Sequence, residues 1–159
     1  MNITIIAAVG KNNELGKNND LIWRFKEDMK FFKESTTGKP IVMGLNTFYS
    51  LPKLLPNRKH IVLSNVPVSL PEEVTVVNSM EKLLRLIHSL DQEVMIIGGA
   101  SIYHQFMPFA NKLLLTEIDA SSEADVYFPA FEKSEWEKKI LSVQEENGIT
   151  FEHVEYMKK

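Results

Sequence analysis

Cysteine is absent from this 159-residue chain. Its absence excludes a disulfide framework, a thiolate metal site and a catalytic thiol. An excess of charge of one sign is also missing, because 21 Asp and Glu stand against 18 Lys and Arg, a formal net charge of -3 at pH 7. Nucleic acid and anionic membranes attract strongly basic surfaces, so we expect neither as a partner.

Long apolar runs are missing too. No run approaches the length that spans a membrane, and the N-terminus has no basic segment of the kind that begins a signal peptide. We therefore expect no membrane association and a cytoplasmic location. Apolar residues make up 44% of the chain, which at this length supports one domain with a sizeable core.

Several motifs of known chemistry do not occur. The chain has no GxGxxG dinucleotide fingerprint, no Walker A phosphate loop, no GxSxG nucleophile elbow and no HExxH zinc spacing. The histidines are scattered, and we interpret each as a surface or half-buried residue rather than a ligand; they are His60, His88, His104 and His153. No metal site is predicted.

Apolar runs and helical periodicity alternate along the chain up to residue 118. The predicted strands are 3–9, 41–43, 60–64, 74–77, 94–97 and 112–118. The main predicted helices are 26–36, one that Asn78 or Ser79 can cap and whose apolar face runs from Leu83 to Leu90, and one that contains residues 102–107. Residues 11–20 are predicted to form a polar loop. Two further strands, 136–143 and 149–156, flank the hairpin signal Asn147-Gly148. This order predicts an α/β fold, a mostly parallel central mixed sheet with an antiparallel C-terminal edge, flanked by helices.

One acidic residue breaks the pattern of the helix at 26–36. Phe25, Met29 and Phe32 are spaced to form one apolar helical face, and Asp28 follows Phe25 by three residues on that face. A carboxylate directed into a core needs hydrogen-bond donors that compensate its lost hydration. Alternatively, Asp28 is an acidic residue of a first helical turn, where the helix dipole favours negative charge.

Other candidate residues follow strand ends, where ligands bind in sheets of this kind. Gly98-Gly99, between a strand and a helix, allows close approach of a ligand to the backbone, although it also fits a plain tight turn. Gly44 to Thr47 and the loop before Asp28 occupy similar positions. Arg58 follows a Pro-Asn turn, and its guanidinium suits a ligand carboxylate if it is not simply solvated.

In order and spacing, these features resemble the bacterial dihydrofolate reductase family over essentially the whole chain. The matching segments are Ile6-Ala7-Ala8, Leu15-Gly16, Leu21-Ile22-Trp23 with Asp28 and Phe32, 39–44, Thr47-Phe48, 55–58, 97–99, Tyr103, Leu115-Thr116 and Phe128-Pro129. The resemblance implies one reductase domain over residues 1–159, in which residues 39–91 or so form a subdomain on the adenosine side of the cofactor.

The implied reaction is the NADPH-dependent reduction of 7,8-dihydrofolate to 5,6,7,8-tetrahydrofolate, with hydride transfer to pterin C6 and protonation at N5. It is a step of one-carbon metabolism. The resemblance also implies a monomer that binds dihydrofolate and antifolate inhibitors.

The same resemblance implies roles for individual residues. Asp28 would hold the 2-amino and N3 edge of the pterin, with Thr116 as its only side-chain support and Trp23 positioning a water, and the loop through Leu21 would hold the nicotinamide. Arg58 would bind the glutamate tail, with Lys53 as a second cation. The implied substrate-binding residues are Ile6, Ala8, Met29, Phe32, Leu51, Lys53, Leu55, Arg58, Ile97 and Tyr103. The implied cofactor-binding residues are Ala8, Leu15, Gly16, Asn19, Gly44, Asn46, Thr47, Leu63, Ser64, Asn65, Gly98, Gly99, Ala100, Ser101 and Ile102.

The chain departs from the family pattern at several positions, among them Ala100 in the usual glycine triplet and Lys53 in place of arginine near the substrate tail. Ile22 replaces the usual proline, and Leu45 and Ser101 replace basic residues that face the 2′-phosphate of the cofactor. We therefore predict a reduced preference for NADPH over NADH. Two other functions remain open: a pyrimidine reductase of riboflavin synthesis, which gives no reason for Asp28 or Arg58, and a nucleotide-binding module without catalysis.

Overall fold

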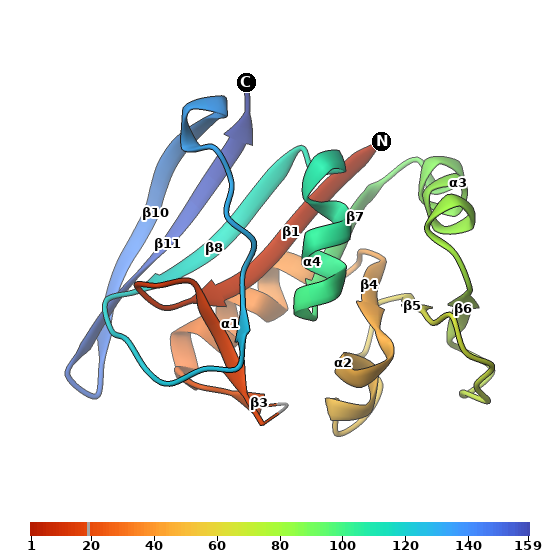
Figure 1. Cartoon of the computed structure of the whole chain (residues 1–159), viewed down its shortest axis with the longest axis horizontal. Helices are drawn as coiled ribbons and strands as arrows, with labels where there is room; N and C mark the ends of the chain where they lie inside the picture. Colours follow the sequence, from red (N-terminus) through yellow and green to blue (C-terminus); the bar gives the residue numbers. More distant parts are fainter. Residues whose placement is uncertain (19) are drawn as a thin grey trace.

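The main sheet contains eight strands in the order β10-β11-β8-β1-β7-β4-β5-β6. The computed structural model describes residues 1–18 and 20–159. The strands of this sheet are β1 (Asn2–Val9), β4 (Ile41–Gly44), β5 (His60–Leu63), β6 (Thr75–Val77), β7 (Glu93–Gly98), β8 (Lys112–Ile118), β10 (Trp136–Glu146) and β11 (Ile149–Lys158) (Figure 1). Neighbours from β8 to β6 are parallel, while β11 pairs antiparallel with β8 and with β10. The predicted sheet with an antiparallel C-terminal edge is confirmed.

In the described part of the chain, four α-helices connect or flank these strands: α1 (Lys26–Thr36), α2 (Leu45–Ser50), α3 (Met80–Leu90) and α4 (Ala100–Phe106). Two short 3-10 turns, η1 (Met107–Phe109) and η2 (Lys133–Glu135), follow α4 and precede β10. Ser79 caps the start of helix α3, because its hydroxyl accepts a hydrogen bond from the Lys82 N–H. Asp91 caps the end of the helix with its backbone in the left-handed conformation. Among the described residues, we find no helix with the length and apolarity needed to cross a membrane.

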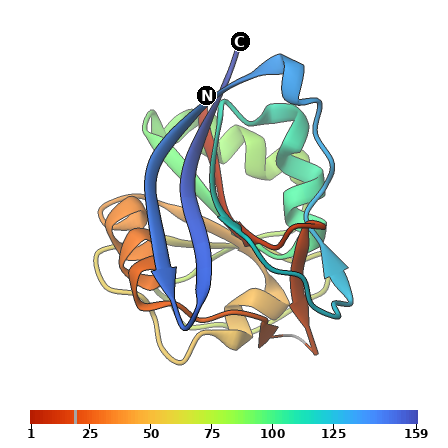
Figure 2. The same cartoon turned by 90° about the vertical axis from the view of Figure 1, so that its left-hand side faces the viewer.

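Strand β1 lies in the middle of the sheet and is covered on both faces (Figure 2). Ile3 and Ile5 pack in a cluster with residues of α3 and α4. Ile6, on the opposite face, packs in a second cluster with residues of α1 and α2. The alternation of a strand explains this division, and a parallel sheet with two covered faces explains the continuous apolar run.

The segment predicted as a polar loop, 11–20, contains strand structure instead. Strand β2 (Glu14–Lys17) pairs antiparallel with β3 (Asp20–Leu21) and with β9 (Val126–Tyr127) to form a second, three-stranded sheet. Asn13 and Asn18 adopt positive φ next to β2, a conformation that asparagine tolerates. The polar composition of this segment gave no strand signal, and β9, the second partner of β2, lies more than a hundred residues away along the chain.

The predicted apolar face of α1 is only partly buried. Phe25, at the N-terminal cap, is buried and stacks on Phe151 with ring centroids 4.5 Å apart. Phe32 is half-buried, but Met29 is 62% exposed, so the prediction that all three face the core is wrong for Met29. The helix therefore leaves part of its apolar face uncovered beside Asp28.

Candidate active site

Asp28 lies in the first turn of α1, and its side chain is 22% exposed. The buried Thr116 of β8 donates a hydrogen bond from its hydroxyl to Asp28 Oδ1. Both interpretations of Asp28 therefore hold, because the residue is at once a first-turn acid and a carboxylate directed at the sheet. The structure contains the contact with Thr116 that the sequence predicts.

Thr116 is not the only side chain that supports Asp28, and that prediction is wrong. His153 Nε2 lies 3.2 Å from Asp28 Oδ1. His153 belongs to β11, where it is paired in register with Thr116, and it is 3% exposed rather than a surface or half-buried residue. The sequence alone did not give the register of β11 against β8, so the contact could not be predicted.

Tyr103 of α4 connects this region to β1. Its hydroxyl donates a hydrogen bond of 2.7 Å to the carbonyl oxygen of Ile6. Burial, and secondly the negative charge of Asp28, raise the pKa of Tyr103 well above its usual value. Tyr103 therefore remains a neutral hydrogen-bond donor at neutral pH.

The structure brings together most of the apolar residues that the resemblance assigns to substrate binding. One cluster contains five of them, Ile6, Phe32, Leu51, Leu55 and Ile97. Trp23 and Ala8 pack in a neighbouring cluster with Phe25. Met29 and Leu21 are exposed, and neither belongs to these clusters. The surface around Asp28 is thus apolar and partly open, which suits a flat aromatic ligand.

Arg58 is held in a defined orientation. Its Nε donates to the Pro56 carbonyl oxygen and its Nη1 donates to Thr36 Oγ1, both at 3.0 Å. Partial burial lowers the pKa of Arg58, although a guanidinium remains charged at neutral pH. Its Nη2 makes no hydrogen bond with any described residue, so it remains free for a carboxylate. Lys53, the predicted second cation, is exposed.

A glycine cradle forms where β7 meets α4. Gly98 has φ of +130°, and a Cβ there would lie 3.5 Å from Thr47 Oγ1. A Cβ on Gly99 would lie 3.4 Å from the same hydroxyl, and one on Gly44 would lie 3.1 Å from Ile102. The structure therefore brings together these five predicted cofactor-binding residues, and the positive φ of Gly98 favours glycine at that position.

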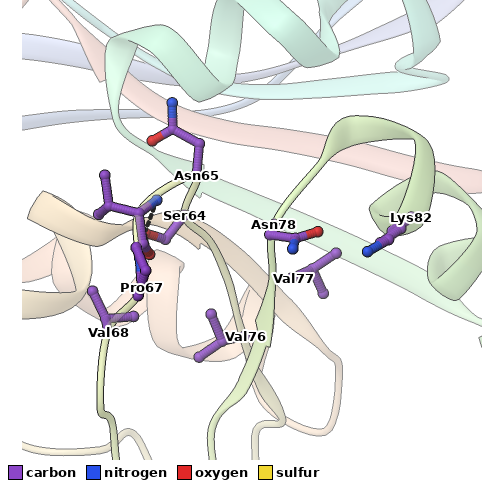
Figure 3. A pocket seen from close by; sticks show the side chains of 9 residues that line it. Ser64, Asn65, Pro67, Val68, Val76, Val77, Asn78 and Lys82 are labelled. Atoms are coloured by element: carbon purple, nitrogen blue, oxygen red, sulfur yellow. Dashed lines mark hydrogen bonds between the residues drawn. The ribbon is translucent and has the colours of Figure 1, made fainter.

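A hollow of about 590 Å³ lies beside the ends of β5 and β6 (Figure 3). Ser64 and Asn65 line it on one side, and Val76, Asn78 and Lys82 line it on the other. Lys82, on α3, supplies a cation there that the sequence analysis did not identify, because an exposed helical lysine carries no distinguishing signal. Other predicted cofactor residues lie around the cradle and the hollow, namely the half-buried Leu63 and Ala100 and the exposed Asn46 and Ser101.

The hairpin of β2 and β3 carries two of the predicted cofactor residues, Leu15 and Gly16, while Asn19 lies outside the described residues. Leu15 packs against the larger core cluster. The buried Glu14, which the sequence analysis missed, accepts hydrogen bonds from the backbone N–H groups of Asn12 at 2.7 Å and Ser122 at 2.9 Å. Burial raises the pKa of Glu14, but these hydrogen bonds outweigh burial and lower it overall. Glu14 thus ties the hairpin to the segment before β9.

Comparison with known proteins identifies the family. A family model described as "Dihydrofolate reductase" matches residues 2–158. The chain is 39% identical to the dihydrofolate reductase of Bacillus subtilis (strain 168) over 161 residues, which covers 99% of this chain and 95% of that protein. It is also 39% identical to the dihydrofolate reductase of Neisseria gonorrhoeae over 166 residues, which covers 100% of this chain and 99% of that protein.

A solved structure agrees with these sequence matches. The dihydrofolate reductase from Enterococcus faecalis, complexed with NADP(H) and RAB-propyl, superposes with a TM-score of 0.88 at 30% identity, covering 99% of this chain and 96% of that chain. The chain belongs to the dihydrofolate reductase family.

Proposed function

We propose that this chain reduces 7,8-dihydrofolate to 5,6,7,8-tetrahydrofolate, with NADPH as the hydride donor. The observation that carries the proposal is the Asp28 carboxylate. Thr116 and His153 both contact Oδ1, while Oδ2 makes no hydrogen bond with the part of the chain that the structure describes. The carboxylate can accept a paired hydrogen bond from the 2-amino and N3–H groups along one edge of the pterin, with Oδ2 free to take part in it.

Asp28 has a second task in this proposal. Its negative charge beside the pterin favours the protonated form of the ring at N5, with the proton delivered by a water that Trp23 helps to position. The apolar side chains of Ile6, Phe32 and Ile97 exclude bulk water from the reacting face. Arg58 holds the glutamate tail through its free Nη2, and Lys53 adds positive charge near it.

The cofactor fits the cradle and the hollow. When bound, the reduced nicotinamide supplies the hydride that reaches pterin C6. Gly98 and Gly99 have no side chains, so the cofactor can approach the protein backbone there. Ala8, Leu15 and the loop through Leu21 hold the nicotinamide end of the cofactor. Ser64, Asn65 and Lys82 line the adenosine side, which supports the assignment of residues 39–91 as an adenosine-side subdomain.

Cofactor preference follows from the charges near the 2′-phosphate. Leu45 and Ser101 contribute no positive charge, and Lys82 is a single flexible cation in the hollow. We therefore propose that NADPH is used with a reduced preference over NADH. We also propose that the protein acts as a monomer in the cytoplasm and binds antifolates at the Asp28 site.

The test is steady-state turnover by the purified protein. NADPH oxidation is measured with dihydrofolate, with the aminopyrimidine substrate of riboflavin synthesis and with neither, and the series is repeated with NADH. We expect turnover with dihydrofolate alone, faster with NADPH. Turnover with the aminopyrimidine instead would identify a pyrimidine reductase. NADPH binding without turnover of either substrate would favour the non-catalytic module.

A further inference from the structure

His153 lies in the middle of a row of three polar side chains that crosses the antiparallel edge of the sheet. In register, it is paired with Thr116 of β8 on one side and with Ser142 of β10 on the other. Its Nδ1 is 3.1 Å from Ser142 Oγ, and its Nε2 is 3.2 Å from Asp28 Oδ1. Residues directly opposite each other on antiparallel strands present their side chains on one face, so strand register alone produces this row.

The imidazole of His153 is fixed between the sheet and α1. Phe31, on the same helix as Asp28, stacks on it with ring centroids 4.0 Å apart and planes 9° from parallel. Phe151 packs edge-on at 5.7 Å. Because packing already holds the ring, little side-chain entropy is lost when its nitrogens form hydrogen bonds.

The partners of the two nitrogens define where the hydrogen lies. The ionised Asp28 carboxylate only accepts, so Nε2 carries a hydrogen and donates it. In the neutral ring, Nδ1 then accepts from the Ser142 hydroxyl; in the imidazolium, Nδ1 donates to the same oxygen. The donation to Asp28 is the same in both states.

Two donors, Thr116 and His153, therefore act on the same oxygen of Asp28 from adjacent strands. Oxygen Oδ1 is occupied, and the plane of the carboxylate is set by the sheet rather than by the exposed first turn of α1. We propose that His153 is a positioning residue, which orients Asp28 so that Oδ2 is presented to the pterin. This inference deepens the proposed function and rests on it.

Two substitutions separate positioning from packing. His153→Phe keeps an aromatic ring against Phe31 but removes the N–H donor, whereas His153→Gln keeps an N–H donor at a similar reach but removes the ring. His88→Phe, on the exposed side of α3, is the matched control. The readouts are the Kd of dihydrofolate by tryptophan fluorescence without cofactor, kcat and KM, and the thermal unfolding midpoint. Nitrogen-15 NMR of the wild-type imidazole gives the protonated nitrogen.

We expect His153→Phe to remain as stable as the wild type while its Kd and KM for dihydrofolate rise about tenfold, the effect of losing one charge-assisted hydrogen bond. His153→Gln should be less stable but should bind dihydrofolate within about threefold of the wild type, since the donor is restored. His88→Phe should match the wild type, and the NMR spectrum should show hydrogen on Nε2. If His153→Phe does not fold, Ser142→Ala, which keeps the stacked ring, should weaken binding about threefold.

Wild-type affinity in a folded His153→Phe, or equal losses in the Phe and Gln variants, would overturn the inference. If His153→Phe does not fold, an unchanged affinity of Ser142→Ala for dihydrofolate would also overturn the inference. A wild-type protein that does not reduce dihydrofolate would overturn the proposed function and this inference together. Normal wild-type turnover with unaffected His153 variants would overturn this inference alone.

Discussion

At the scale of the residue, Asp28 is acted on by neighbours from three elements. The first turn of α1 supplies a favourable dipole, and Thr116 of β8 and His153 of β11 supply hydrogen bonds. These contacts hold a hydrogen-bond acceptor beside an apolar surface, which is what recognition of a pterin edge requires.

Thr116→Val tests one of these contacts at nearly constant side-chain volume. Valine removes the donor to Asp28 Oδ1 and leaves a methyl group in its place, so the KM for dihydrofolate should rise about fivefold to tenfold. The effect on kcat should be smaller, because the substitution changes substrate binding more than the reacting atoms. Steady-state kinetics measures both values, with the exposed Thr150→Val as control. An unchanged KM would show that the hydroxyl does not support substrate binding.

The difference between Asp28 and His153 shows what sequence reasoning can reach at this scale. Asp28 was recognisable because its position within one helix conflicts with the apolar face around it. His153 has no such local conflict, and its role depends on pairing with Thr116, from which it is separated along the chain by β9, η2 and β10. The register of β11 against β8 places this histidine beside Asp28 rather than at the surface, and no local sequence pattern encodes that register.

At the scale of the element, the hairpin of β2 and β3 is held to the rest of the chain by its pairing with β9, by Leu15 in the larger core cluster and by side-chain hydrogen bonds. Glu14 bridges it to Ser122, and the side chain of Asp125 accepts from the Asn18 N–H at 2.9 Å. The hairpin also carries Leu15 and Gly16, so its stability bears on cofactor binding.

Glu14→Gln should loosen this hairpin. The ionised carboxylate accepts two backbone N–H groups, and an amide accepts more weakly and adds donors without partners. Because the pKa of Glu14 is lowered in the folded state, its contribution is present at neutral pH and is lost as the pH falls through that value. Hydrogen exchange should show about tenfold faster exchange at the amides of Asn12 and Ser122 in the variant at pH 7. Equal protection in both proteins would contradict the assigned role.

The junction of β7 and α4 gives a second prediction at this scale. Gly98→Ala places a Cβ at φ of +130°, so the backbone must shift, and the new methyl would contact Thr47 and Tyr103. We expect NADPH binding to weaken by about tenfold or more, measured by quenching of protein fluorescence. Gly38→Ala is the control, since Gly38 also has positive φ but nothing lies within 4 Å of its added Cβ. Equal NADPH affinity in the two variants would show that the glycine cradle does not bind the cofactor.

Most elements could be predicted and a few could not, for physical reasons. Runs such as 41–43 and 112–118 are recognisable because strands buried on both faces are continuously apolar, and the Asn147-Gly148 signal defined the final hairpin. Strands β2 and β9 have only four and two residues, too few to show a periodic pattern, and they pair with each other. The exposure of Met29 likewise depends on how far the sheet extends beneath α1, which periodicity does not encode.

At the scale of the whole molecule, Glu93 joins three parts of the chain at one end of the sheet. Its carboxylate contacts Lys39 at 2.8 Å, Lys112 at 3.1 Å and the Thr4 hydroxyl at 2.5 Å. Burial raises the pKa of Glu93, but these partners outweigh burial and lower it to about 2, compared with an ordinary value of 4.5. The folded state therefore gains stability above pH 4.5 and loses it as the pH falls toward 2.

Glu93→Gln should lower the free energy of unfolding at pH 7 by about 1–3 kcal/mol, because two lysines lose their shared partner. The difference from the wild type should shrink as the pH falls below 4.5, where the unfolded carboxyl becomes protonated. Urea unfolding at a series of pH values measures both effects. A difference that stays constant down to pH 3 would contradict the assigned pKa.

The central claim is that the Asp28 carboxylate, held at the antiparallel edge of the sheet, carries the reduction of dihydrofolate. The most direct measurement is single-turnover reduction of dihydrofolate by NADPH deuterated at the transferred position, with wild type and Asp28→Asn compared at saturating ligand. Asparagine keeps the shape but lacks the charge that favours protonation of the pterin. We predict deuterium at C6 of tetrahydrofolate and a rate about a hundredfold or more lower in the folded variant. A wild-type rate in Asp28→Asn would contradict the account.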